Sequence, residues 1–171
     1  MVNFYLDDIE ELKGGIDYIK ADAQGAEFTI YKNAPEVTKT ACIVHTEANL
    51  IPVYKDQHLF AEQDQILREY GFLFHKFNDS MGRTIKPFYN RNNPAAAMSQ
   101  MIQVNAVYVK DLRYLSQLSS DKLFKLAIIL HDVYASYDLC HLVLNSYDKI
   151  SGASIAASYL QRLQQESELA G

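Results

Sequence analysis

The segment from Ile16 to Ala34, which reads IDYIKADAQGAEFTIYKNA, constrains the fold more than any other part of the chain. Its first half is a short and mostly apolar run, which is typical of a strand buried on both faces of a parallel sheet. Asp22 ends the run, and from Gly25 onward apolar residues recur at helical spacing. The segment therefore predicts a strand that passes directly into a helix.

Asp22 is the first candidate site residue, because ligands of open α/β sheets bind at the carboxyl ends of the strands. An Asp at a strand-to-helix junction is also a common cap of the helix that follows. The sequence leaves both interpretations open.

A second buried strand is predicted at Ala41 to Val44, and it runs out at Glu47. A strand–helix–strand unit with the usual right-handed crossover makes the two strands parallel neighbours, so Asp22 and Glu47 are expected on the same edge of the sheet. Two carboxylates there suit general-base chemistry or a divalent cation. The alternative is that Glu47 only supports or caps a neighbouring group.

Further along, a helix is expected at Ala61 to Tyr70, a strand at Phe72 to Phe77, and an antiparallel partner strand at Val104 to Val109. The residues before the first strand, Val2 to Leu6, are expected to be the tail of another strand. Residues 113–171 are expected to form a helical extension that packs on the core or at an interface, without a catalytic pattern.

The segment from Asn78 to Met101 has turn-forming residues and little periodicity, and such long segments in compact domains are often functional or disordered. Arg83, Lys86 and Arg91 in this segment are candidate ligands of a polar or anionic substrate. A plain mobile lid explains the same pattern equally well.

The net charge of −5 and the scattered basic residues argue against a nucleic-acid partner. The two cysteines, Cys42 and Cys140, are expected to be buried thiols in a reducing compartment. The sequence shows neither a signal peptide nor an apolar run of ~18 residues that could span a bilayer. A cytoplasmic protein without a membrane partner is therefore expected.

The motif Lys20, Asp22, Gln24, Gly25 and Glu27 resembles the pattern Lys-x-Asp-x-Glu/Gln-Gly-x-Glu of FkbM-type methyltransferases. The stretches LDDIEEL and PVYKDQHLFAEQDQILREYGFLFHKF are also similar to that family. The resemblance covers residues 3 to about 110, and it is to the carboxyl-terminal half of the family's domain.

The resemblance implies a Rossmann-like enzyme that uses S-adenosylmethionine to methylate hydroxyl groups, often on sugars or sugar-decorated natural products. Residues 1–112 would then form a partial Rossmann-like α/β sheet of parallel strands with a terminal antiparallel strand. Asp22 would act as base or as ligand of a magnesium ion, with help from Glu47, and Asp7 would lie near the adenosine.

The chain departs from the family pattern at one point. A complete enzyme of this type needs a glycine-rich turn after a first strand, and no such turn occurs among the seven glycines. The isolated chain is therefore expected to bind the cofactor poorly, and the strand at Ile16 to Ala21 is expected to have an open edge that favours a homo-oligomer. Two functions remain open: a fragment of an O-methyltransferase, or a non-catalytic relic that acts as an assembly or binding module.

Overall fold

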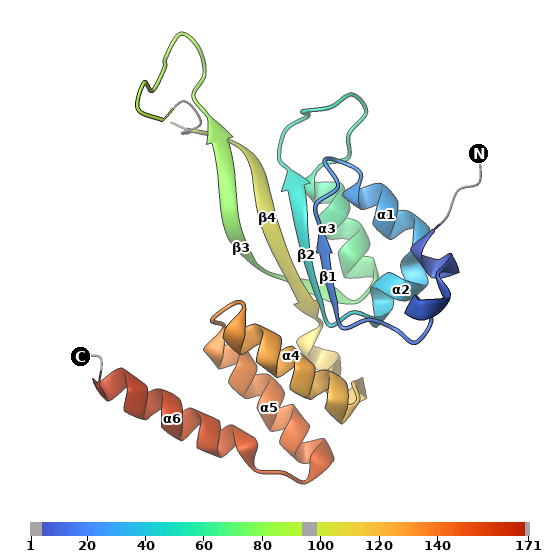
Figure 1. Cartoon of the computed structure of the whole chain (residues 1–171), viewed down its shortest axis with the longest axis vertical. Helices are drawn as coiled ribbons and strands as arrows, with labels where there is room; N and C mark the ends of the chain where they lie inside the picture. Colours follow the sequence, from blue (N-terminus) through green and yellow to red (C-terminus); the bar gives the residue numbers. More distant parts are fainter. Residues whose placement is uncertain (1–4, 94–98, 170–171) are drawn as a thin grey trace. The chain divides into compact units, whose positions relative to one another are not determined.

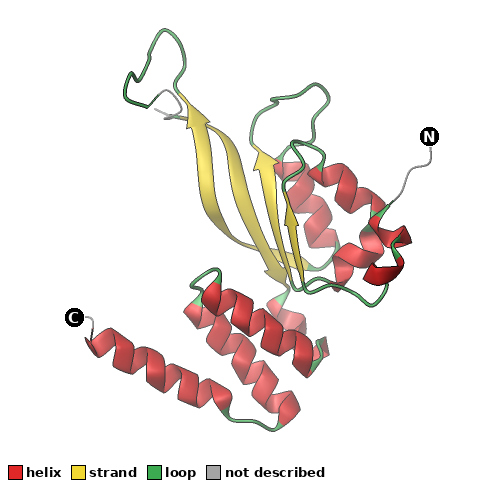
Figure 2. Cartoon of the chain, viewed as in Figure 1, coloured by secondary structure: helices red, strands yellow, loops and turns green. Residues whose placement is uncertain are grey.

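The computed structural model describes residues 5–93 and 99–169, with side chains described as far as residue 165. The chain divides into two compact units, Met1–Lys110 and Asp111–Gly171. The first unit is a mixed α/β unit with a four-stranded sheet, and the second is helical (Figures 1 and 2).

The first unit begins with two short 3-10 helices, η1 (Leu6–Asp8) and η2 (Glu10–Leu12). The expected strand tail at Val2 to Leu6 is therefore wrong at Leu6, and residues 2–4 lie outside the described part of the chain. The helices that follow are α1 (Glu27–Asn33), α2 (Pro35–Thr40) and α3 (Phe60–Glu69).

The strands are β1 (Tyr18–Ala21), β2 (Ile43–Asn49), β3 (Phe72–Arg83) and β4 (Gln100–Lys110), in the sheet order β1-β2-β4-β3. Strands β1 and β2 are parallel, and β4 runs antiparallel to both of its neighbours. The predicted strand-turn-helix, the parallel pair and the antiparallel pairing of the last two strands are confirmed. Strand β4 lies between β2 and β3, which places β1 at an edge of the sheet.

Three strands are longer than the sequence predicted, and one of them is β4, which begins at Gln100 rather than Val104. Strand β2 continues to Asn49 because β4 pairs with it along its whole length, from Ile43 opposite Val109 to Asn49 opposite Gln103. Strand β3 continues to Arg83, so the expectation of irregular structure from Asn78 is wrong. Register shifts in β3 interrupt the alternation of side chains, which hides the strand from a period-two pattern.

Helices α1 and α3 cover one face of the sheet (Figure 2). The core between them is apolar and includes Tyr31 of α1, Leu67 of α3, Val44 of β2 and Tyr108 of β4, all fully buried. Because side chains alternate along a strand, His45, Glu47 and Asn49 of β2 project to the opposite face. One face of the sheet thus provides stability, and the other presents polar groups.

The second unit consists of η3 (Leu112–Gln117), α4 (Ser120–Asp132), α5 (Tyr137–Ser151) and α6 (Ile155–Leu169). Ser119 caps α4 by accepting a hydrogen bond from the backbone N–H of Lys122 at 3.2 Å. The apolar stripe of α4 packs against α5, and Leu123, Leu126 and Leu130 are almost fully buried. The predicted helical content is confirmed. Both cysteines are free and buried, as expected.

Candidate active site

The turn after β1 requires its glycine. Gln24 and Gly25 have φ angles of 53° and 99°, in the region that side chains other than glycine rarely adopt. A Cβ atom on Gly25 would lie 2.8 Å from Nε2 of Gln57 and 3.2 Å from the ring of Tyr54. The loop that follows β2 therefore packs directly on this turn.

The buried side chain of Glu27 stabilises the same turn through hydrogen bonds to its backbone. Its side chain is fully buried, and its carboxylate accepts hydrogen bonds from the backbone N–H of Ala23 at 2.7 Å and of Gly25 at 3.0 Å. Hydrogen bonds from backbone amides satisfy a carboxylate that burial would otherwise destabilise. Glu27 thus fixes the backbone on both sides of Gln24.

Asp22 and Glu47 lie side by side at the carboxyl ends of β1 and β2. Ala21 is the register partner of Thr46, so the next residue of each strand brings the two carboxyl groups together. Asp22 is exposed, whereas Glu47 retains only 7% of its accessible surface. The expected meeting of the two acids on one edge is confirmed.

Burial raises the pKa of Glu47 above its ordinary value of 4.5, and the charges of Asp22 and Glu27 raise it further. A hydrogen bond between the Glu47 and Asp22 carboxyl groups acts in the same direction, and the charge of Lys20 opposes it. Glu47 can therefore hold or release its proton closer to neutral pH than an ordinary glutamate does.

His45 lies two register positions before Glu47 on β2, and Lys20 is its register partner on β1. Burial lowers the pKa of His45 and the Lys20 charge lowers it further, while Asp79 opposes both effects. The His45 Nδ1 atom lies 3.3 Å from the hydroxyl of Tyr18. His45 was not among the predicted site residues, although it precedes Glu47 by two residues on the same face of β2.

A pocket of about 240 Å³ lies beside Glu47. Its polar lining combines this carboxylate with three side-chain amides, Gln24, Asn49 and Gln103, and with the guanidinium of Arg83. The remaining walls are Val53, Tyr54, Met81 and Ile102. Such a set offers hydrogen-bond donors and acceptors around a carboxylate, which suits a polar, uncharged ligand.

The structure separates the three basic residues that the sequence grouped as substrate ligands. Arg83 lines the pocket, whereas Lys86 and Arg91 lie beyond the end of β3, exposed, and are not among its lining residues. Asn49 and Gln103 were missed, because the sequence pattern ended β2 too early and could not show that β4 is its neighbour.

Asp7 lies elsewhere. Its carboxylate accepts hydrogen bonds from the backbone N–H groups of Glu36 at 3.1 Å and Val37 at 2.8 Å, which caps α2 at its amino end. Burial raises the pKa of Tyr70, at the end of α3, and the charge of Asp7 adds to the rise. Asp7 is therefore engaged in helix capping, and the structure does not bring it to the Asp22–Glu47 pair.

The structure does not offer a set of ligands for the expected magnesium ion. In the parts of the chain that it describes, no three His, Cys, Asp or Glu side chains converge. The sulfonium of S-adenosylmethionine is a cation, and the acidic edge formed by Asp22 and Glu47 fits it electrostatically. The residues at this edge thus fit the sulfonium end of the cofactor, and they do not support a metal.

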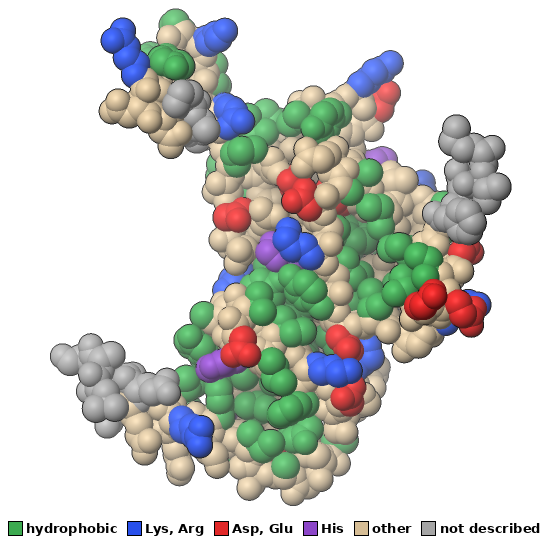
Figure 3. Space-filling view, viewed as in Figure 1, with side chains coloured by type: hydrophobic (Ala, Val, Ile, Leu, Met, Phe, Trp, Pro, Cys, Tyr) green, Lys and Arg blue, Asp and Glu red, His purple; other side chains and the backbone are tan. Residues whose placement is uncertain are grey.

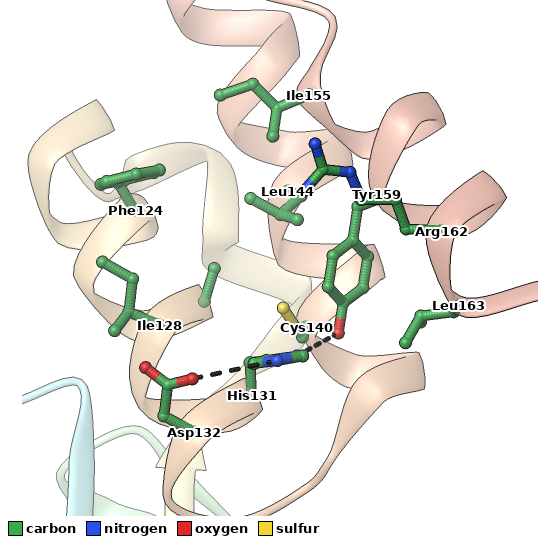
Figure 4. A pocket seen from close by; sticks show the side chains of 11 residues that line it. Phe124, Ile128, His131, Asp132, Cys140, Leu144, Ile155, Tyr159, Arg162 and Leu163 are labelled. Atoms are coloured by element: carbon green, nitrogen blue, oxygen red, sulfur yellow. Dashed lines mark hydrogen bonds and ion pairs between the residues drawn. The ribbon is translucent and has the colours of Figure 1, made fainter. Parts of the chain in front are cut away.

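A second cavity, of about 320 Å³, lies within the helical unit between α4, α5 and α6 (Figure 4). Its walls are mostly apolar, and the Tyr159 hydroxyl lies 2.9 Å from Nδ1 of His131. Burial raises the pKa of the Cys140 thiol, which keeps it protonated. The cavity is therefore a gap between packed helices, and the Cys140 thiol that lines it is not an activated nucleophile.

In a comparison with protein families, residues 4–74 match the model of the methyltransferase FkbM domain. The matched segment contains Asp22, Glu27 and Glu47, and it points to a methyltransferase. It ends at residue 74, short of the expected residue 110, and lies toward the amino end of this chain. It therefore does not support the expectation of a carboxyl-terminal half alone.

No curated protein and no solved structure matches the chain. None of the helices that the structure describes has the length and apolar character needed to cross a membrane.

Proposed function

We propose that the first unit is part of an S-adenosylmethionine-dependent O-methyltransferase of the FkbM type with a Rossmann-like sheet. The sheet edge at which β1 and β2 end would activate the hydroxyl group of the methyl acceptor. The observation that carries the proposal is the Asp22–Glu47 pair at the carboxyl ends of two adjacent parallel strands. The common direction of β1, β2 and β3, with β4 as the antiparallel strand, fits a sheet of that class.

In this proposal the carboxylate pair takes the proton of the acceptor hydroxyl. When bound, S-adenosylmethionine supplies a methyl group on a positively charged sulfur, which leaves as a neutral thioether. Glu47, with Asp22 beside it, would take the proton of the acceptor hydroxyl during the transfer. The raised pKa of Glu47 suits this role, because a general base works best when its pKa lies near the operating pH.

The pocket beside Glu47 is the proposed site of the acceptor, a hydroxyl of a sugar or sugar-decorated natural product. The amides of Gln24, Asn49 and Gln103 can each donate to one hydroxyl and accept from another. Arg83 adds a donor at the side of β3, and Tyr54 provides an aromatic wall. Arg83 is the one member of the basic group that we propose as an acceptor ligand.

Calorimetry of the full chain with S-adenosylmethionine tests the proposal. We expect weak but measurable binding, as the missing glycine-rich turn implies, and a further weakening of about 5- to 10-fold in Asp22→Asn because one negative charge near the sulfonium is lost. Glu69→Gln removes an exposed charge from the end of α3 and serves as the control with unchanged affinity. Absence of binding at millimolar cofactor would favour the competing function, a non-catalytic assembly module.

A further inference from the structure

The β3–β4 hairpin ends in an apolar and basic tip, which we define as residues Met81 to Asn93. Ile85, Phe88 and Tyr89 are 62%, 66% and 68% exposed, more than any other large apolar side chain in the described part of the chain. Exposure of three neighbouring large apolar side chains is unfavourable in water, and such patches usually mark an interaction surface.

The tip is held by its own hydrogen bonds. The backbone N–H of Phe88 donates to the carbonyl of Ile85 at 3.2 Å, which closes a turn. The side-chain oxygen of Asn90 accepts hydrogen bonds from the backbone N–H of Asn92 at 3.0 Å and Asn93 at 3.1 Å. These bonds give the apolar side chains a local scaffold at the end of the two strands.

The charge of the tip is opposite to that of the whole chain. It carries Arg83, Lys86 and Arg91, and no acidic residue occurs between Asp79 and Asp111, although the net charge of the chain is −5. Figure 3 shows basic side chains beside hydrophobic ones at the far end of this hairpin. The concentration of positive charge therefore coincides with the exposed apolar group.

We propose that the hairpin tip binds the surface of an anionic membrane, with Phe88 and Tyr89 entering the headgroup region and Lys86 and Arg91 pairing with acidic lipids. Aromatic side chains favour the membrane interface, and each basic residue near an anionic surface adds about a factor of five in affinity. A protruding tip suits a soft surface, whereas a small molecule needs a concave site.

This binding mode does not require a membrane-spanning helix. It differs from the expectation drawn from the sequence, which was a chain without a membrane partner. The tip rises from the same edge of the sheet at which β1 and β2 end in Asp22 and Glu47. A membrane bound there would lie on the side of the carboxylate pair.

Sedimentation of the full chain with vesicles provides the first test. We expect binding to vesicles of phosphatidylcholine with about 30% phosphatidylglycerol, and little binding to phosphatidylcholine alone or in high salt. Lys86→Glu with Arg91→Glu should weaken binding at least about 30-fold. Lys32→Glu with Lys149→Glu changes the net charge equally on α1 and α5 and should bind nearly as the unaltered chain does.

Fluorescence provides the second test, because the chain has no tryptophan. The Tyr89→Trp variant should show a blue shift with anionic vesicles and quenching by brominated lipid, whereas Tyr114→Trp, at a position 50% exposed in the second unit, should show neither. The proposal is overturned by absence of vesicle binding, by equal binding to neutral vesicles, or by equal loss in the control pair. It is also overturned if heparin binds at the tip while the fluorescence of Tyr89→Trp responds to no vesicle, since the partner is then a soluble polyanion.

Discussion

Glu47 has a carboxyl group that the fold makes harder to ionise. Because its folded-state pKa is raised above 4.5, the folded protein binds this proton more tightly than the unfolded chain does. The stabilising contribution of the neutral group is fully present below pH 4.5, and it is lost as the pH rises through the folded-state pKa. At neutral pH, the ionised Glu47 therefore lowers the free energy of unfolding.

Glu47→Gln removes this unfavourable charge and keeps the shape of the side chain. We expect the variant to be more stable than the unaltered chain at about pH 7, on the order of 1 kcal/mol, with the difference vanishing near about pH 4. Urea denaturation at both pH values measures it. A variant that is less stable at neutral pH would contradict this expectation, because the ionised carboxylate would then be stabilised by a partner in the folded state.

Glu27 acts on the same pair through its charge and on the turn through its hydrogen bonds. Glu27→Gln should lower the pKa of Glu47, because the Glu27 charge contributes to its rise. It should also destabilise the fold by about 2 kcal/mol, because the Gln N–H₂ group would replace one of the two acceptor oxygens and would face the backbone N–H of Ala23 or of Gly25. Urea denaturation and carboxyl NMR report the two effects separately, and Glu69→Gln should show neither.

At the scale of elements, the strand-turn-helix from β1 to α1 depends on one glycine. Gly25→Ala should destabilise the unit by about 1 to 2 kcal/mol, because φ at this position is 99° and the added Cβ would meet Gln57. Gly14→Ala is the matched control, since nothing lies within 4 Å of its added Cβ. Thermal unfolding of both variants measures the difference, and equal melting temperatures would contradict the described packing of the loop.

The sequence predicted those elements that local patterns define. A buried run ending in Asp22 and Gly25 identified the β1–α1 junction, and the parallel pair with β2 followed from the chirality of crossovers. The insertion of β4 between β2 and β3 depends on contacts between residues that are far apart in sequence, which no local pattern contains. For this reason Glu47 was found, whereas Asn49 and Gln103, which line the pocket from paired strands, were not.

At the scale of the whole molecule, the open edge of β1 is the feature that bears on assembly. Among the described strands, β1 pairs only with β2, and unpaired strand edges tend to associate. We propose a homo-oligomer through this edge, as the sequence suggested. Size-exclusion chromatography with light scattering should give a mass above 19.5 kDa at micromolar concentration, and a monomer across that range would contradict the proposal.

The proposed general base depends on the raised pKa of Glu47 beside Asp22, and carboxyl NMR of the full chain measures that pKa without cofactor or acceptor. We predict that Glu47 titrates above 4.5, and that Asp22→Asn shifts its midpoint downward because the neighbouring charge is gone. A midpoint at or below 4.5 in the unaltered chain, or one that does not respond to Asp22→Asn, would contradict the proposed general base.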